Sequence, residues 1–255
     1  MSDRGIIMGP GSISRLLDGR KTQTRRILRE PMPPAPSADS IHPSNAGRKV
    51  HATPYFDAYC SARKTSANPR GMSDRWCWWT RDDRQCLPTI RIGYAPGDRL
   101  WVREVSSAYW PSHPAVAPTP GREVTSALIK QTSGGFATAS AGEPVHVFYR
   151  ADTEVLPWTH MTWRSARHMS RWASRLTLTV TDVRVQRLRD ITEEDAEAEG
   201  ADPVLVPPDG GSNPHVEGFR DLWNSLHGRR AWDRNPYVVA ITFSVEQRNI
   251  DDARQ

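Results

Sequence analysis

The stretch SRLTLTVTDVRVQRLRDITEEDAEAEG, residues 174–200, decides the fold that the sequence predicts. In its first part an apolar side chain occupies every second position, which is typical of a strand with one buried face. The alternation breaks at Thr181 and Asp182 and then resumes, so this part forms either one long bent strand or a hairpin. The alternating residues are Leu176, Leu178, Val180, Val183, Val185 and Leu188.

The second part of the stretch predicts a short helix. Thr192 can cap its N-terminus, acidic residues fill its first turn, and Gly200 suits its end. Two further helices are expected within SISRLLDGR (residues 12–20) and VEGFRDLWNSLHG (residues 216–228), because apolar residues recur there at helical spacing and a glycine ends each run.

Three more strands are predicted from alternating apolar residues. They lie in YAPGDRLWVREV (residues 94–105), VHVFYRAD (residues 145–152) and PYVVAITFSVE (residues 236–246). Strands outnumber helices, and neighbouring strands lack the regular helical crossovers of a parallel sheet. We therefore expect an α+β fold, a small mixed or antiparallel β-barrel with peripheral short helices.

The whole chain, residues 1–255, is expected to form a single domain. Residues 31–90 are rich in proline and turn-forming residues, and residues 111–144 are rich in Pro, Ser, Gly and Thr and carry little charge. We interpret both segments as irregular insertions, in the form of long loops. Residues 246–255 are expected to form a flexible C-terminal tail.

Charge is distributed unevenly along the chain. Residues 1–110 carry 18 Lys and Arg against 10 Asp and Glu, whereas residues 190–255 carry 6 against 14. This asymmetry predicts a basic surface that attracts a polyanion, with nucleic acid as the first candidate. Solvated surface charge in an arginine-rich protein is the alternative interpretation.

Cys60, Cys77 and Cys86 are too few and too unevenly spaced for a disulfide framework, and neither a signal peptide nor a membrane span is recognisable. We therefore expect a cytoplasmic protein with no membrane partner, and favour a monomer. With His42 or His51 the cysteines could supply four zinc ligands, but their spacing lacks the short pairs of a structural zinc site. No metal and no cofactor is expected.

The segment GRKTQTRR, residues 19–26, follows the first predicted helix and concentrates cations and hydroxyls. Arginine keeps its proton in proteins whereas lysine can lose it, so Lys21 among Arg20, Arg25 and Arg26 invites a chemical role. A solvated basic turn is the alternative interpretation.

Five segments, in this order, resemble the ASCH domain, a member of the PUA-like superfamily. They are LLDGRKTQTRR, GDRLWVRE, WASRLTLTVTDVRVQRLRDITEEDAEAEG, FRDLWNSLHG and NPYVVAITF. The long inserts and the segment HMSRWASR, residues 168–175, are similar to those of ASCH proteins from bacteriophages and prophages. The resemblance extends from Gly9 to Val245 and leaves the two inserts out.

The resemblance implies a six-stranded barrel-like fold with a cleft that binds RNA or modified nucleosides. One ASCH family is an amidohydrolase that removes the acetyl group of N(4)-acetylcytidine, and its catalytic residues match Lys21, Thr24 and Glu199 here. This chain departs from that family in its inserts, at Arg25 and in its richness in tryptophan.

Amide hydrolysis needs a nucleophile, a base and donors for the developing oxyanion. Thr24 offers a hydroxyl, and Lys21 can act as the base if burial and the neighbouring arginines favour loss of its proton. Glu199 can orient the lysine or pass the proton to the leaving amine. Residues three apart on a strand point to opposite faces, so Lys21 and Thr24 converge only if the segment turns or bulges.

Other residues are candidates for contact with a ligand or nucleic acid. Trp101 could stack on a base or pack in the core, and Arg103 with Glu104 could face a cleft or form an ion pair at the strand end. The segment WRSARHMSRWASR, residues 163–175, suits phosphate contacts combined with stacking, or else forms a solvated face. Its candidate residues are Arg164, Arg167, Arg171 and Trp172.

We therefore expect RNA or a modified nucleoside as the partner and hydrolysis of an acylated exocyclic base amine as the reaction. One alternative is a non-catalytic module of phage origin that binds nucleic acid or a modified base. The other is an ASCH-type ribonuclease that depends on a divalent metal ion.

Overall fold

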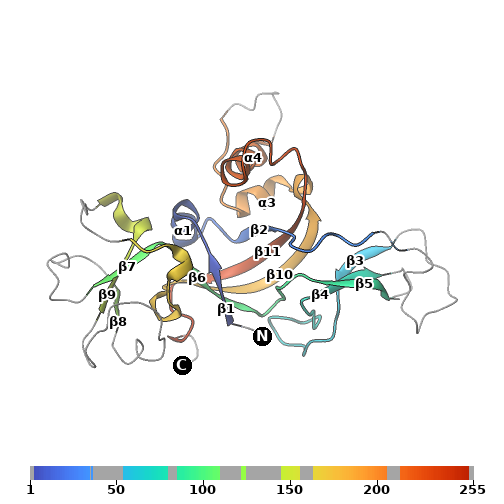
Figure 1. Cartoon of the computed structure of the whole chain (residues 1–255), viewed down its shortest axis with the longest axis horizontal. Coiled ribbons are helices and arrows are strands. Elements are labelled where there is room, and N and C mark those ends of the chain that lie inside the picture. The colour runs from blue at the N-terminus through green and yellow to red at the C-terminus, as the bar shows by residue number, and fades with distance from the viewer. Residues whose placement is uncertain are drawn as a thin grey trace. The chain divides into compact units, whose positions relative to one another are not determined.

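The computed structural model describes residues 3–34, 36, 54–79, 85–109, 122–124, 145–155, 163–205 and 213–252 (Figure 1). This part of the chain contains many strands and few helices, so the predicted α+β class is confirmed. The chain divides into two compact units. The first unit comprises residues 20–98 and 179–244, and the second comprises residues 2–19, 99–178 and 245–255.

The largest sheet contains five strands: β1 (Asp3–Ile7), β2 (Gln23–Ile27), β6 (Arg99–Arg103), β10 (Thr177–Arg187) and β11 (Tyr237–Glu246). Their order in the sheet is β1-β6-β10-β11-β2. β1 runs parallel to β6, and β2 runs antiparallel to β11. β10 continues through Thr181 and Asp182, so the alternating segment is one long strand and not a hairpin.

Two smaller sheets are antiparallel. One has the order β3-β4-β5, with β3 at Tyr55–Ala58, β4 at Arg75–Trp79 and β5 at Gln85–Arg91. The other has the order β7-β9-β8, with β7 at Ser106–Tyr109, β8 at Arg122–Val124 and β9 at Val145–Tyr149.

The first of these sheets corrects the prediction that residues 31–90 are irregular. Alternation was hidden there because residues 76–79 of β4 read WCWW, in which apolar residues occupy both faces of the strand. Of the second predicted insertion, residues 111–144, only β8 lies within the described residues.

Helices α1 (Pro10–Leu17), α3 (Glu193–Ala198) and α4 (Pro214–His227) lie where the sequence predicts them. The Thr192 hydroxyl caps α3 by accepting a hydrogen bond of 3.2 Å from the N–H of Asp195. Gly19 and Gly200 follow their helices with φ of 73° and 76°, a conformation that favours glycine. Short 3-10 turns cover Arg150–Val155, Ala166–His168, Arg171–Ala173 and Leu188–Asp190. None of the described helices is long and apolar enough to cross a membrane.

In the first unit, α3 lies against both α4 and β2 (Figure 1). The apolar stripe of α4 faces this contact: Phe219 and Trp223 are each 3% exposed, whereas Leu226, near the end of the helix, is 67% exposed. Burying these two aromatic side chains contributes about 2–3 kcal/mol each, which stabilises the packing of α4 against α3. The buried cluster contains Leu188, Ile191, Ala196, Ala201, Phe219, Trp223, Ala231 and Val238.

Gly218 lies in α4 where the helix backbone approaches the chain that follows α3. A Cβ at this position would overlap the backbone oxygen of Asp202. We therefore expect Gly218→Ala to lower the free energy of unfolding by about 1–3 kcal/mol, the usual cost of overpacking, in urea denaturation. Gly11→Ala in α1 is the matched control, because its Cβ would meet only the end of the Arg15 side chain. Equal stability of the two variants would contradict the close approach.

The described part of the predicted flexible tail is packed within the second unit. Asn249 and Ile250 are 2% and 0% exposed. The Asn249 amide nitrogen donates to the backbone oxygens of Arg171, Trp172 and Ser174 at 2.9, 3.2 and 2.7 Å. The segment is therefore held by hydrogen bonds as far as it is described, and residues 253–255 lie outside the described residues.

Candidate functional site

Lys21 and Glu199, which the resemblance described above predicts to share one site, are in contact. The Lys21 ammonium donates to Glu199 Oε2 at 2.7 Å and to the backbone oxygen of Glu199 at 2.7 Å. Both side chains are only 4% exposed. The pair is therefore a buried ion pair that joins the segment before β2 to the C-terminal end of α3.

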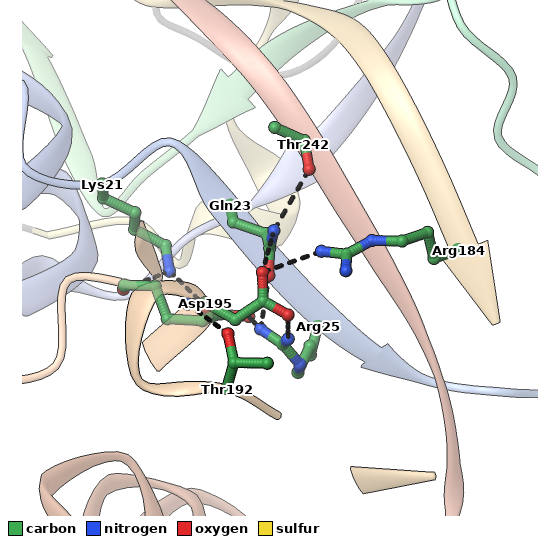
Figure 2. Close-up of polar contacts among 8 residues, drawn as sticks. Lys21, Gln23, Arg25, Arg184, Thr192, Asp195 and Thr242 are labelled. Atoms are coloured by element: carbon green, nitrogen blue, oxygen red, sulfur yellow. Dashed lines mark hydrogen bonds and ion pairs between the residues drawn. The ribbon is translucent and has the colours of Figure 1, made fainter. Parts of the chain in front are cut away.

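Arg25 extends this pair into a network. Its side chain is fully buried and binds Glu199 Oε1 at 3.2 Å through Nη1 and Asp195 Oδ2 at 2.7 Å through Nη2. Asp195 Oδ1 in turn accepts from Gln23 Nε2 at 3.1 Å and from Arg184 Nη2 at 2.8 Å. Figure 2 shows Lys21, Gln23 and Arg25 directed towards the α3 side chains, with Arg184 reaching Asp195 from β10.

The network forms because side chains spaced by two residues on an extended segment lie about as far apart as carboxylates spaced by four residues on a helix. Lys21, Gln23 and Arg25 are spaced by two residues, so they point the same way along an extended chain and are about 6–7 Å apart. Asp195 and Glu199 are spaced by four residues on a helix, which places them about 6 Å apart on one side. α3 packed beside β2 therefore sets its two carboxylates opposite the polar face of the strand.

Thr24 lies on the other face of β2. The strand is paired regularly with β11 from Gln23 to Ile27, with Thr24 opposite Ile241 and no bulge between them. Neighbouring residues of a strand point to opposite faces, so Thr24, which is 5% exposed, points away from the face that carries Gln23 and Arg25. The turn or bulge that would bring Thr24 to Lys21 is absent from this strand, and the geometry does not favour Thr24 as a nucleophile.

The electrostatics of Asp195 follow from its neighbours. Burial acts to raise the pKa of this carboxyl, but the hydrogen bonds from Arg184 and Gln23 and the charge of Arg25 outweigh it and lower the pKa below the ordinary value. Asp195 thus stays charged to low pH. Buried ion pairs are stabilising only when their hydrogen bonds are satisfied, and here each carboxylate oxygen of Asp195 and Glu199 has a partner.

The other arginines of GRKTQTRR are placed differently from one another. Arg20 pairs with Asp202 at 3.2 Å on the surface, where both side chains are more than half exposed. Arg26 is half-buried and, by strand alternation, lies on the face of β2 opposite Arg25. Burial and the nearby charge of Arg26 lower the pKa of His227. Arg20 and Arg26 thus lie apart from the buried pair of Lys21 and Arg25, and the cations of this segment do not form one basic surface.

Four members of the network were not predicted as site residues: Gln23, Arg184, Asp195 and Thr242, whose hydroxyl accepts from Gln23 Nε2 at 3.2 Å. Gln23 could have been recognised from the sequence, because it is two residues from Lys21 and therefore shares its face on an extended chain. The signal for Asp195 was its spacing of four from Glu199.

Glu104, a candidate in the second unit, is 2% exposed. Its ion-pair partner is Arg175, through contacts of 2.9 and 3.0 Å, where the sequence suggested Arg103. Burial raises the pKa of Glu104 although Arg175 acts in the opposite direction. The Arg103 guanidinium lies 5.1 Å from the ring centroid of Trp101, which is half-buried in β6. These residues form internal contacts of the second unit.

The predicted patch in residues 163–175 is not arranged for stacking. Trp172 is 2% exposed, so its ring belongs to the core, and Arg171 binds Asp3 at 2.8 Å and Asp251 at 2.6 Å. Arg164 pairs through its backbone with Ser106. Arg167 is exposed, and its backbone oxygen accepts from Arg103. Trp172 is therefore a core residue, and not the stacking residue that its tryptophan-rich segment suggests.

Among the described residues, no group of three or more His, Cys, Asp or Glu side chains is placed to hold a metal ion. Cys60 is exposed and Cys77 is buried. His42 and His51, the other ligands considered from the sequence, lie outside the described residues.

Comparison of the chain with known protein families, with curated proteins and with solved structures finds no match.

Proposed function

We propose that the protein has an ASCH-like fold of the PUA-like superfamily, with a barrel-like sheet, and that it binds RNA or a modified nucleoside at the Lys21–Glu199 pair. The observation that supports this most is the contact itself. Lys21 and Glu199 are 178 residues apart in the chain, and the resemblance to the ASCH domain assigns both to one site. Their ion pair agrees with that assignment.

The proposed reaction is hydrolysis of an acylated exocyclic amine of a base. Lys21 and Glu199 would form its proton-transfer pair, because they touch and belong to the two classes of side chain that exchange protons most readily in buried sites. Since Thr24 points to the other face, we assign the attack on the acyl carbon to water. Glu199 takes a proton from that water as its oxygen bonds to the acyl carbon, and Lys21 gives a proton to the amine as the C–N bond breaks, so that acetic acid and the free amine result. The proton on Glu199 then passes to Lys21 across their contact of 2.7 Å, which restores both side chains.

A second function, binding without hydrolysis, is favoured by the burial of the pair. Lys21 and Glu199 are 4% exposed, so a substrate reaches them only if neighbouring side chains move. Arg184, whose side chain is 42% exposed, is the accessible end of the network and could contact a base or phosphate without such movement. A binding module would need only this end.

Cytidine release from N(4)-acetylcytidine distinguishes the two functions. We expect turnover by the wild-type protein and a loss of at least about 100-fold in Lys21→Arg, because arginine can keep the ion pair but cannot give up a proton. Lys64→Arg, at an exposed position, is the matched control and should be unaffected. Thr24→Val should retain turnover if water is the nucleophile.

An absence of turnover by the wild-type protein, with nucleoside or RNA binding retained in calorimetry, would refute the hydrolase and leave the binding module. Cleavage of RNA that requires a divalent metal ion would instead indicate the ribonuclease.

A further inference from the structure

The sheet β3-β4-β5 of the first unit has two unlike faces. Directly opposite residues of an antiparallel pair point the same way, so Phe56 and Trp78 share one face and Tyr55 and Trp79 share the other. The first face carries an aromatic cluster, in which Trp76 is 3% exposed and the Phe56 ring packs 5.9 Å from that of Trp76 and 5.4 Å from that of Trp78. On the second face Cys77, opposite Asp57, is 0% exposed.

The second face carries aromatic side chains at the surface. Tyr55 is 41% exposed, and Tyr59 and Trp79 are half-buried. Tyr59 extends the ladder beyond β3, since its N–H donates to the carbonyl of Arg75 at 2.8 Å, and alternation places it on the same face as Tyr55. From Tyr55 to Tyr59 an extended strand advances about 13 Å, which is a suitable length for the two or three bases that aromatic sheets bind.

The Trp79 ring is held in place on this face. Its Nε1 donates to the backbone oxygen of Asp57 at 3.1 Å, and its ring centroid lies 5.3 Å from that of Tyr59. A side chain that is already held loses little conformational entropy when a ligand stacks on it. The ring is therefore organised for stacking before any ligand binds.

Cations border the aromatic face. Arg75 is exposed, lies opposite Arg91 in the β4–β5 pairing, and is placed on the aromatic face by strand alternation. Residues 54–91 contain seven Lys and Arg against four Asp, a net charge of +3. Asp57 lies on the aromatic face by strand alternation, and Arg70 neutralises its charge through an ion pair. Arg91 pairs in the same way with Asp74, and both pairs are of the weak, exchangeable surface kind.

From this combination we infer that the Tyr55–Tyr59–Trp79 face of the β3-β4-β5 sheet binds single-stranded nucleic acid by base stacking, with Arg75 contacting phosphate. Every base has a flat face that an aromatic ring can cover, and a double helix hides those faces, so an unpaired strand is the occupant. An aromatic surface also suits a protein partner, but the excess of cations at its border favours a polyanion. The inference adds a site to the proposed function and does not depend on Lys21.

Fluorescence anisotropy of short, end-labelled oligo(U) and oligo(dT) tests the inference. Trp79→Phe and Trp79→Leu both lose the hydrogen bond to Asp57, but only Trp79→Phe keeps an aromatic ring. We expect Trp79→Leu to bind about 5- to 150-fold more weakly than the wild-type protein, the range of one stacked base, and Trp79→Phe to retain most of the affinity. A preference for one strand type would show whether RNA or DNA is the ligand.

The phosphate contact is tested by salt dependence. Arg75→Ala should reduce the slope of log K against log salt by about 0.7, the value for one phosphate of a single strand. Arg229→Ala removes the same charge from an exposed position outside this sheet and should leave the slope unchanged. Circular dichroism confirms that each variant is folded.

Equal oligonucleotide affinity of wild type, Trp79→Leu and Arg75→Ala would overturn the inference. If Lys21→Arg weakens the binding of oligonucleotides and the sheet variants do not, the strand lies at the Lys21 site, so this inference fails while the proposed function stands. Self-association that Trp79→Leu abolishes, without oligonucleotide binding, would make the face a protein interface and would also overturn it. Loss of nucleoside turnover with strand binding intact affects only the proposed function.

Discussion

Replacement of Glu199 by alanine is expected to lower the free energy of unfolding by about 3–5 kcal/mol, the cost of breaking a buried ion pair. Both carboxylate oxygens of Glu199 are occupied, one by Lys21 at 2.7 Å and the other by Arg25 at 3.2 Å. Their side chains are 4% and 0% exposed, so water cannot easily replace the lost carboxylate. Urea denaturation of Glu199→Ala measures the effect.

The matched control is Glu197→Ala, because Glu197 is exposed and lies in the same helix. We expect that variant to change stability by less than about 0.5 kcal/mol. Glu199→Gln should fall between the two, since an amide oxygen accepts hydrogen bonds but carries no charge. If Glu199→Ala and Glu197→Ala are equally stable, the network does not hold α3 to β2 as described.

Replacement of Arg175 by methionine is expected to have a similarly large effect, about 3–5 kcal/mol near pH 7, but with a strong dependence on pH. Arg175 binds Glu104 through contacts of 2.9 and 3.0 Å and Asp152 through contacts of 2.7 and 2.9 Å. Its guanidinium also lies 4.0 Å from the ring centroid of Tyr149. Because Glu104 is 2% exposed, removing the arginine leaves a buried carboxylate without its cation.

The direction of the pH dependence follows from Glu104. Burial already raises the pKa of this carboxyl above its ordinary value of 4.5, and loss of Arg175 removes the main opposing influence. A carboxyl with a higher pKa in the folded state binds its proton more tightly there, so stability falls as the pH rises from 4.5 through the raised pKa. The difference in unfolding free energy between wild type and Arg175→Met should therefore be small near pH 4 and largest near pH 7.

A second substitution separates this mechanism from a loss of packing. Glu104→Gln in the Arg175→Met background removes the charge and should restore much of the stability near pH 7 while abolishing the pH dependence. Arg167→Met, at an exposed position of the same unit, should have little effect. A loss in Arg175→Met that is the same near pH 4 and pH 7 would show that packing on Tyr149, and not the charge of Glu104, is responsible.

The secondary structure around the site was predictable because its signals are local. Alternation predicted β10 and β11, and Thr192 with Gly200 marked both ends of α3. The pairing of Lys21 with Glu199 was predictable only from the resemblance to the ASCH domain. Neither periodicity nor spacing relates two residues that are 178 positions apart.

Two predicted site residues depend on the direction in which a side chain points, which the sequence does not fix. Trp172 was a stacking candidate by its neighbours in the sequence, but the chain fold buries it. Thr24 was a candidate nucleophile, but regular pairing of β2 with β11 sends it to the face opposite Gln23 and Arg25. In a tryptophan-rich segment such as β4, the sequence shows no polar face from which to read the strand.

From the sequence alone one obtains the α+β class, most of the strands around the site, the helices and the concentration of cations in residues 19–26, because caps, apolar periods and charge runs depend on neighbours in the chain. Only the tertiary structure decides which charges meet. α3 lies beside β2, so two carboxylates spaced by four residues face three polar side chains spaced by two. This arrangement of charges arises from packing between segments that are distant in the chain. Because of it, the basic segment GRKTQTRR contributes Lys21 and Arg25 to a buried ion network.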